Sequence, residues 1–88
     1  MASIKQLKKD LNNRFGEIID GALINQETNP ELPKEKTEEL VDNVISEFDE
    51  LVEQINKKDV ENRAKHLSSV KDNIQKKSEE FIERLNSL

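Results

Sequence analysis

The apolar residues of this chain recur at helical spacing in three segments, and the middle segment has the clearest pattern. With positions placed 100° apart around a helix, its apolar side chains share an arc of about 140°. They are Leu40, Val41, Val44, Ile45, Phe48, Leu51, Val52 and Ile55. No polar residue between positions 40 and 55 falls inside this arc. The pattern predicts an amphipathic helix over residues 33–56, with an apolar face wide enough to contact two neighbouring helices.

The first segment predicts a helix over residues 3–25. Ser3 and Gln6 have the spacing of a capping box, in which each side chain bonds the backbone amide of the other residue. The apolar stripe consists of Ile4, Leu7, Leu11, Phe15, Ile18 and Ala22, and Ile19 and Leu23 widen it near its end. Gly16 and Gly21 interrupt this stretch. One interpretation is that the helix tolerates these glycines or needs them for the close approach of another helix. The alternative is that the helix kinks or ends at Gly21.

The third segment predicts a helix over residues 59–87, with Asp59 as its N-cap. Its apolar residues share an arc of about 120°. They are Val60, Ala64, Leu67, Val70, Ile74, Phe81, Ile82, Leu85 and Leu88. Lys71 and Ser78 lie at the centre of this arc.

The two connections between these segments have different signals. Residues 25–33 contain Pro30 and Pro33, which remove backbone donors and disfavour helical geometry in the preceding residue, so this stretch is a loop. Pro33 can also open the second helix at its first position. The second connection, residues 56–59, contains neither glycine nor proline.

The evidence for a break at residues 56–59 is the phase of the apolar pattern. From Ile55 to Val60 the apolar direction shifts by about 140°, so one straight helix would have two apolar faces pointing apart. A tight turn, with Asn56 as a left-handed C-terminal residue, lets both faces meet one core. The alternative is a single continuous helix, which would require a partner chain.

These segments predict an all-α fold, an elongated up-down-up antiparallel three-helix bundle that forms a single domain over residues 1–88. Composition agrees, because 33% of the residues are hydrophobic and 38% are charged, which suits narrow buried stripes better than a large spherical core. With only two glycines and two prolines, the chain lacks the turn residues of an all-β fold.

The charge of the chain is concentrated in its middle. The formal net charge is −5, with ten acids and three bases in residues 27–57 and a slight excess of bases on either side. This distribution argues against binding to nucleic acid or to an anionic membrane, both of which require clustered bases. Four acids form what we call the acidic strip, a candidate surface for a basic partner: Glu39, Asp42, Glu50 and Glu53. The simpler interpretation is a solvated face that pairs with bases of the flanking helices.

The usual catalytic and metal-binding patterns each lack a component. The only histidine, His66, has Ser69 nearby but no acid four residues before it, so we expect it to lie on the surface without a role. Arg63 replaces the glutamate of a Glu-x-x-His metal element, and there are no cysteines. We therefore expect no catalytic residues, no metal and no cofactor, and a protein that is not an enzyme.

Lys71 is the residue that most contradicts its predicted surroundings. An ammonium group in an apolar stripe either extends to the edge on its packed stem or acts as a polar core residue that fixes helix register or oligomeric state. For Ser78 we expect a hydrogen bond to the preceding helical turn.

The remaining predictions concern location and role. The N-terminus has no apolar signal region and no apolar run reaches the length of a membrane span, so we expect a soluble, cytoplasmic protein. We expect a non-enzymatic helical module that binds a protein partner or itself, for instance as a homodimer. The alternative is a small acidic regulator or inhibitor of a basic protein target. The sequence carries no motif diagnostic of a family.

Overall fold

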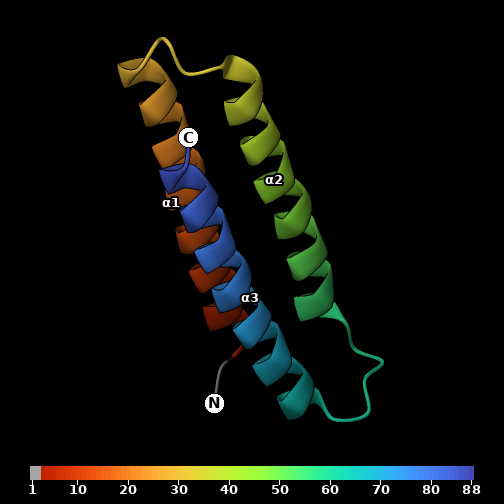
Figure 1. The fold of residues 1–88 in the computed structure, drawn as a ribbon. Helices are drawn as coiled ribbons and strands as arrows, with labels where there is room; N and C mark the ends of the chain where they lie inside the picture. Colours follow the sequence, from red (N-terminus) through yellow and green to blue (C-terminus); the bar gives the residue numbers. More distant parts are fainter. Residues whose placement is uncertain (1–2) are drawn as a thin grey trace.

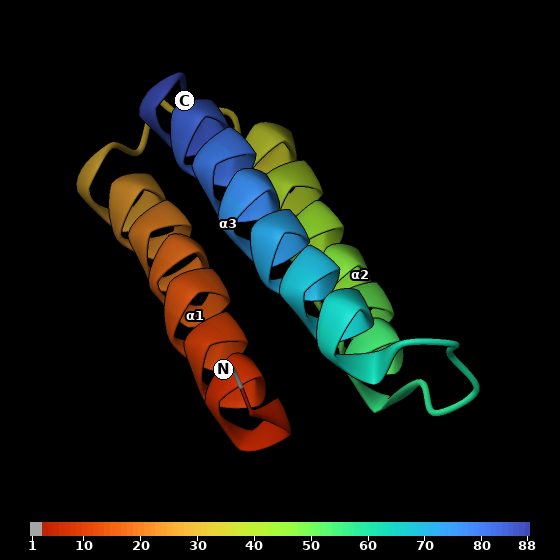
Figure 2. The ribbon, with the colours of Figure 1, turned by 90° about the horizontal axis from the view of Figure 1, so that it is seen from below.

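The computed structural model describes residues 3–88, and over these residues it contains three helices. They are α1 (Ile4–Thr28), α2 (Lys34–Asn56) and α3 (Arg63–Asn86). The helices run up, down and up with nearly parallel axes (Figures 1 and 2), and each contacts the other two. The molecule measures 49 × 19 × 17 Å. The predicted elongated three-helix bundle is therefore confirmed.

Helix α1 begins as its sequence predicts. The Ser3 hydroxyl accepts a hydrogen bond from the Gln6 amide at 3.1 Å, and the Gln6 side chain accepts one from the Ser3 amide at 3.4 Å. The helix continues past Gly21 and past its predicted end at Asn25, and it ends at Thr28. Gly21 therefore does not end the helix.

The two glycines of α1 have different surroundings. A Cβ atom built on Gly21 would lie 3.0 Å from Cδ2 of Leu85, so the missing side chain allows α3 to approach α1 closely. A Cβ atom built on Gly16 would have no neighbour within 4 Å. Close approach therefore explains Gly21, whereas Gly16 is a tolerated glycine.

Because of this difference, alanine is expected to stabilise the protein more at position 16 than at position 21. Gly16→Ala is expected to raise the free energy of unfolding by about 1 kcal/mol, because alanine is the better helix former and meets no neighbour. For Gly21→Ala the same gain is offset by the contact with Leu85. Urea denaturation followed by circular dichroism compares the two, and a gain for Gly21→Ala as large as for Gly16→Ala would contradict the close approach.

The second helix and its start agree closely with the sequence. Pro33 is the N-cap of α2, and the helix begins at Lys34, one residue later than predicted. The Pro33 carbonyl accepts a hydrogen bond from the Lys36 amide at 3.1 Å. Proline is tolerated here because the amides of the first helical turn have no intrahelical acceptor.

The connection between α2 and α3 is a real break, but it is longer than predicted. Helix α3 begins at Arg63, and its N-cap is Asn62, whose side chain accepts a hydrogen bond from the Lys65 amide at 3.1 Å. The prediction of Asp59 as N-cap was wrong. Asp59 and Asn62 are both good N-cap residues, and the shift in the apolar pattern indicates that the helix breaks but not how long the loop is.

The predicted geometry of this turn was also wrong. No residue within 3–88 has a positive φ angle, so Asn56 does not adopt the left-handed conformation. Instead the chain leaves α2 at Lys57, which is extended at φ −65° and ψ 125°. The loop of residues 57–62 has enough length to reverse the chain without a left-handed residue.

One apolar core runs along the bundle axis and draws on all three helices. Its buried members are Leu7, Leu11, Phe15, Ile18, Ala22, Leu40, Val44, Leu51, Ile55, Val70, Ile74 and Phe81. Phe15 lies at its centre, 5.7 Å from Phe81 in an edge-to-face arrangement and 6.4 Å from Phe48, measured between ring centroids. These three rings join α1, α2 and α3 at one level.

Candidate protein-interaction surface

The acidic strip lies on the outer face of α2. All four of its carboxylates, those of Glu39, Asp42, Glu50 and Glu53, are exposed. By helical geometry they fall in an arc of about 80°, because the spacing from Glu39 to Glu50 and from Asp42 to Glu53 is close to three full turns. The apolar side of the same helix holds Leu40, Val44, Leu51 and Ile55 in the core. The amphipathic pattern of α2 therefore positions the strip by burying the opposite side.

No member of the acidic strip pairs with a base among residues 3–88. The ion pairs of this part of the chain are Arg14–Asp10 at 3.0 Å, Lys34–Glu38 at 3.9 Å and Lys77–Glu80 at 3.7 Å. Each joins residues of one helix, so the helices are not held together by salt bridges across their interfaces. The interpretation that the strip pairs with bases of the flanking helices is not supported.

One end of the strip borders a shallow groove between α2 and α3. Glu39 lines it together with two acids and two bases from the two helices. The full lining is Lys36, Glu39, Leu40, Glu80, Glu83, Arg84, Ser87 and Leu88. Because acids and bases both line it, this groove has no clear preference for an anionic or a cationic ligand.

Lys71 does not lie in the core. Its side chain is exposed, so of the two interpretations the register-setting polar core residue was wrong and the position at the edge of the stripe is the one observed. The reason lies in the apolar residues that shifted the predicted arc toward it: Val60 is in the loop, Ala64 is exposed and Ile82 is 46% exposed. The buried stripe of α3 is narrower and centres on Val70, Ile74 and Phe81, which leaves Lys71 at its edge.

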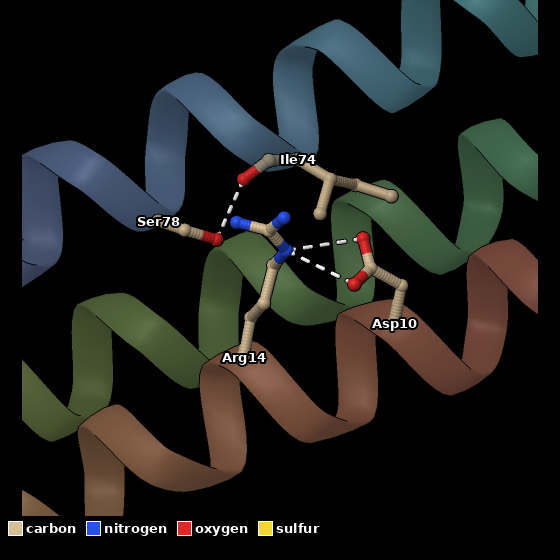
Figure 3. A network of polar contacts seen from close by, with 4 residues as sticks. All are labelled: Asp10, Arg14, Ile74 and Ser78. Atoms are coloured by element: carbon tan, nitrogen blue, oxygen red, sulfur yellow. Dashed lines mark hydrogen bonds and ion pairs between the residues drawn. The ribbon is translucent and has the colours of Figure 1, made fainter.

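Ser78 is the polar residue that the stripe of α3 does bury. It is fully buried, and its hydroxyl donates a hydrogen bond of 2.7 Å to the carbonyl of Ile74, as the sequence predicts. Figure 3 shows this bond beside Arg14 of α1, whose guanidinium extends toward α3 while its Nε donates to both carboxylate oxygens of Asp10. Arg14 and Ser78 line the same groove between α1 and α3. The arginine covers this interface with its stem and keeps its charge paired.

His66 has a structural contact that the sequence did not indicate. Its Nε2 lies 2.7 Å from the carbonyl oxygen of Gln54, near the end of α2. A carbonyl can only accept, so Nε2 carries the hydrogen in this contact. The same carbonyl accepts a longer hydrogen bond of 3.4 Å from the Lys57 amide, and His66 adds a shorter one from the first turn of α3. The expectation of a surface histidine without a role was therefore wrong, and the contact joins the two helices across their loop.

A second unforeseen contact stands at the opposite end of the bundle. The Gln26 side chain donates a hydrogen bond of 2.8 Å to the carbonyl of Leu32 and accepts one of 2.7 Å from the hydroxyl of Thr37. Thr37 is buried. Within residues 3–88 every buried side-chain nitrogen or oxygen has a hydrogen-bond partner. One signal was present in the sequence, because Gln26 and Thr37 continue the apolar stripes of their helices with polar residues.

Residues 3–88 contain no cluster of three or more histidine, cysteine, aspartate or glutamate side chains arranged to hold a metal ion. Within the same range, no helix combines the length and apolar character that crossing a membrane requires.

No protein-family model, curated protein or solved structure matches this chain at a significant level. The function is therefore inferred from the surfaces of the chain itself.

Proposed function

We propose that this protein is a non-enzymatic helical module that acts by binding a protein partner. The observation that carries the proposal is the acidic strip, whose four carboxylates are exposed on one face of α2 and have no basic partner within residues 3–88. An unneutralised set of like charges creates a field that steers an oppositely charged surface. The partner is therefore expected to present a basic face.

The distribution of charge over the three helices supports the same proposal. Helix α2 has eight acids and two bases, whereas in α1 and α3 the two signs nearly balance. Like charges on one helix face cost stability at spacings of three and four residues. A surface that contributes nothing to packing and weakens its own helix is typical of one shaped by recognition.

The test is a charge reversal with a matched control. In one variant all four acids of the strip become lysine: Glu39→Lys, Asp42→Lys, Glu50→Lys and Glu53→Lys. In the control, four exposed acids of the loop and of α3 are reversed: Asp59→Lys, Glu61→Lys, Asp72→Lys and Glu79→Lys. Both variants change the net charge equally. We expect the first to abolish capture of the partner from a native lysate and the second to retain it. Equal capture by both variants would refute a role for the strip.

A second candidate is a small regulator that neutralises a basic target by presenting carboxylates in place of phosphates. The exposed strip favours it as well, and ionic strength separates the two. Binding dominated by charge falls steeply as salt rises from low to physiological concentration, because exposed charges are screened beyond about 10 Å at 0.1 M. Docking that also buries apolar surface retains most of its affinity.

A further inference from the structure

Four large aliphatic side chains are exposed on the described surface, and two of them share one face. Their exposed fractions are 54% for Leu23, 56% for Ile24, 46% for Ile45 and 46% for Ile82. Scattered apolar residues are ordinary on a protein surface, whereas a contiguous patch marks an interaction site. Whether any of these residues are neighbours follows from the register of the helices.

The register of α1 against α2 is fixed by two contacts. Phe15 packs against Phe48, and Gln26 is bonded to Thr37. From Phe15 to Gln26 the chain advances by as many residues as it retreats from Phe48 to Thr37, so the antiparallel register is constant between them. Leu23 is therefore level with Leu40. Ile45 lies five residues beyond that level, about 7.5 Å along the axis.

Leu23 and Ile45 both point away from α3. Gly21 marks the side of α1 that faces α3, because Leu85 packs there, and Leu23 is two residues on, about 200° around the helix. Lys36 lines the groove between α2 and α3, and Ile45 is nine residues on, about 180° around. The two side chains thus lie on the outer side of the α1–α2 interface.

Two half-buried residues join them into one patch. Ile19 lies one turn before Leu23, Val41 lies one turn before Ile45, and both pack against the core. We call these four residues the outer patch: Ile19, Leu23, Val41 and Ile45. Ile24 and Ile82 are not part of it, since Ile24 lies toward the α3 side of α1 and Ile82 lines the groove between α1 and α3.

The rim of the outer patch is acidic on both helices. On α1, Asp20 and Glu27 stand three residues before and four residues after Leu23, and both are exposed. The same spacing places Asp42 and Asp49 beside Ile45 on α2, again exposed. Every base of α1 lies at or before Arg14, more than two turns away from Leu23.

We propose that the outer patch binds one amphipathic helix of a partner protein, with aliphatic residues on its apolar face and lysine or arginine at the borders of that face. The inference rests on the proposed function and names the partner's chemistry. A helix lying along the outer side of the α1–α2 interface would place residues spaced i, i+3, i+4 and i+7 on the aliphatic side chains and its bases beside the four carboxylates. A second copy of this chain fits poorly, because it would bring two acidic rims together.

The test measures binding of a designed peptide to the full chain. The probe is a fluorescein-labelled peptide of 18 residues, with leucine at i, i+3, i+4 and i+7 positions and lysine at the borders. Fluorescence anisotropy gives its affinity, and a peptide with glutamate in place of lysine is the charge control. We expect the lysine peptide to bind and the glutamate peptide to bind at least about tenfold more weakly.

The variants separate this patch from other exposed apolar surface. Leu23→Gln with Ile45→Gln is expected to weaken binding at least about tenfold, because both contacts lose apolar burial. The matched control, Ile24→Gln with Ile82→Gln, removes equally exposed residues elsewhere and is expected to change binding less than about twofold. Equal effects of the two pairs would overturn the proposal, as would equal binding of both peptides. A dimer in light scattering that Leu23→Gln with Ile45→Gln dissolves would overturn it in favour of a second copy.

Failure of this inference can be told apart from failure of the proposed function. If reversal of the acidic strip abolishes capture of the native partner while Leu23→Gln with Ile45→Gln does not, the module binds a protein but not through the outer patch. If neither set of changes affects capture, both proposals fall.

Discussion

Phe15→Ala is expected to lower the free energy of unfolding by about 3–5 kcal/mol, the largest effect of any substitution considered for this chain. The ring is 1% exposed and stacks edge-to-face on Phe81 of α3 while also meeting Phe48 of α2. Truncation removes the aromatic contacts of two interfaces at once and leaves a cavity that three rigid helices cannot collapse into. Urea denaturation followed by circular dichroism measures the loss.

The matched control is Ile24→Ala on the same helix. Ile24 is 56% exposed, so its truncation is expected to change stability by less than about 0.5 kcal/mol. Since domains of this size have a small total stability, Phe15→Ala is expected to leave a large unfolded population at 37 °C. A loss below about 1 kcal/mol would contradict the central position of this ring.

The sequence predicted the fold well where the apolar pattern was unbroken. Helix α2 lies within one residue of its predicted bounds, because no polar residue interrupts its stripe and Pro33 marks its start. The phase shift between Ile55 and Val60 correctly indicated a break. The spacing of apolar residues shows which side of a helix is apolar, and for that reason it identified the three helices along the chain.

The same reasoning failed where apolar residues are not buried. Val60, Ala64 and Ile82 entered the predicted stripe of α3 and placed Lys71 at its centre, although none of these residues is buried. An apolar residue in a loop or on a surface is energetically acceptable, so apolar character alone does not prove burial. The start of α3 was misplaced for a related reason, since Asp59 and Asn62 are equally good caps.

The candidate surface was predictable only in part. The acidic strip follows from the sequence, because four acids at helical spacing opposite an apolar stripe must share the solvent-exposed face of α2. The outer patch does not, because it depends on the register between α1 and α2. That register is set by contacts between distant residues, and no local pattern contains it. The contact of His66 with Gln54 is of the same kind.

The second large effect concerns Gln26, the residue that joins α1, the loop and α2. Gln26→Ala is expected to lower the free energy of unfolding by about 2–3 kcal/mol, because it leaves the buried hydroxyl of Thr37 and the carbonyl of Leu32 without a partner. Thr37→Val keeps the side-chain shape and removes the hydroxyl, so a smaller loss of about 1 kcal/mol is expected.

A double-mutant cycle distinguishes the hydrogen bond from general disruption of the corner. In Gln26→Ala with Thr37→Val no hydroxyl is left unpaired, so the combined loss is expected to fall about 1 kcal/mol short of the sum of the single losses. Amide hydrogen exchange gives an independent measure. The hydrogen-bonded amides of Asn29 and Leu32 are expected to lose protection in Gln26→Ala and to keep it in Thr37→Val, where the bond to Leu32 survives. Strict additivity in the cycle would show that Gln26 and Thr37 act separately, and the polar corner would then not be a unit that holds α1 against α2.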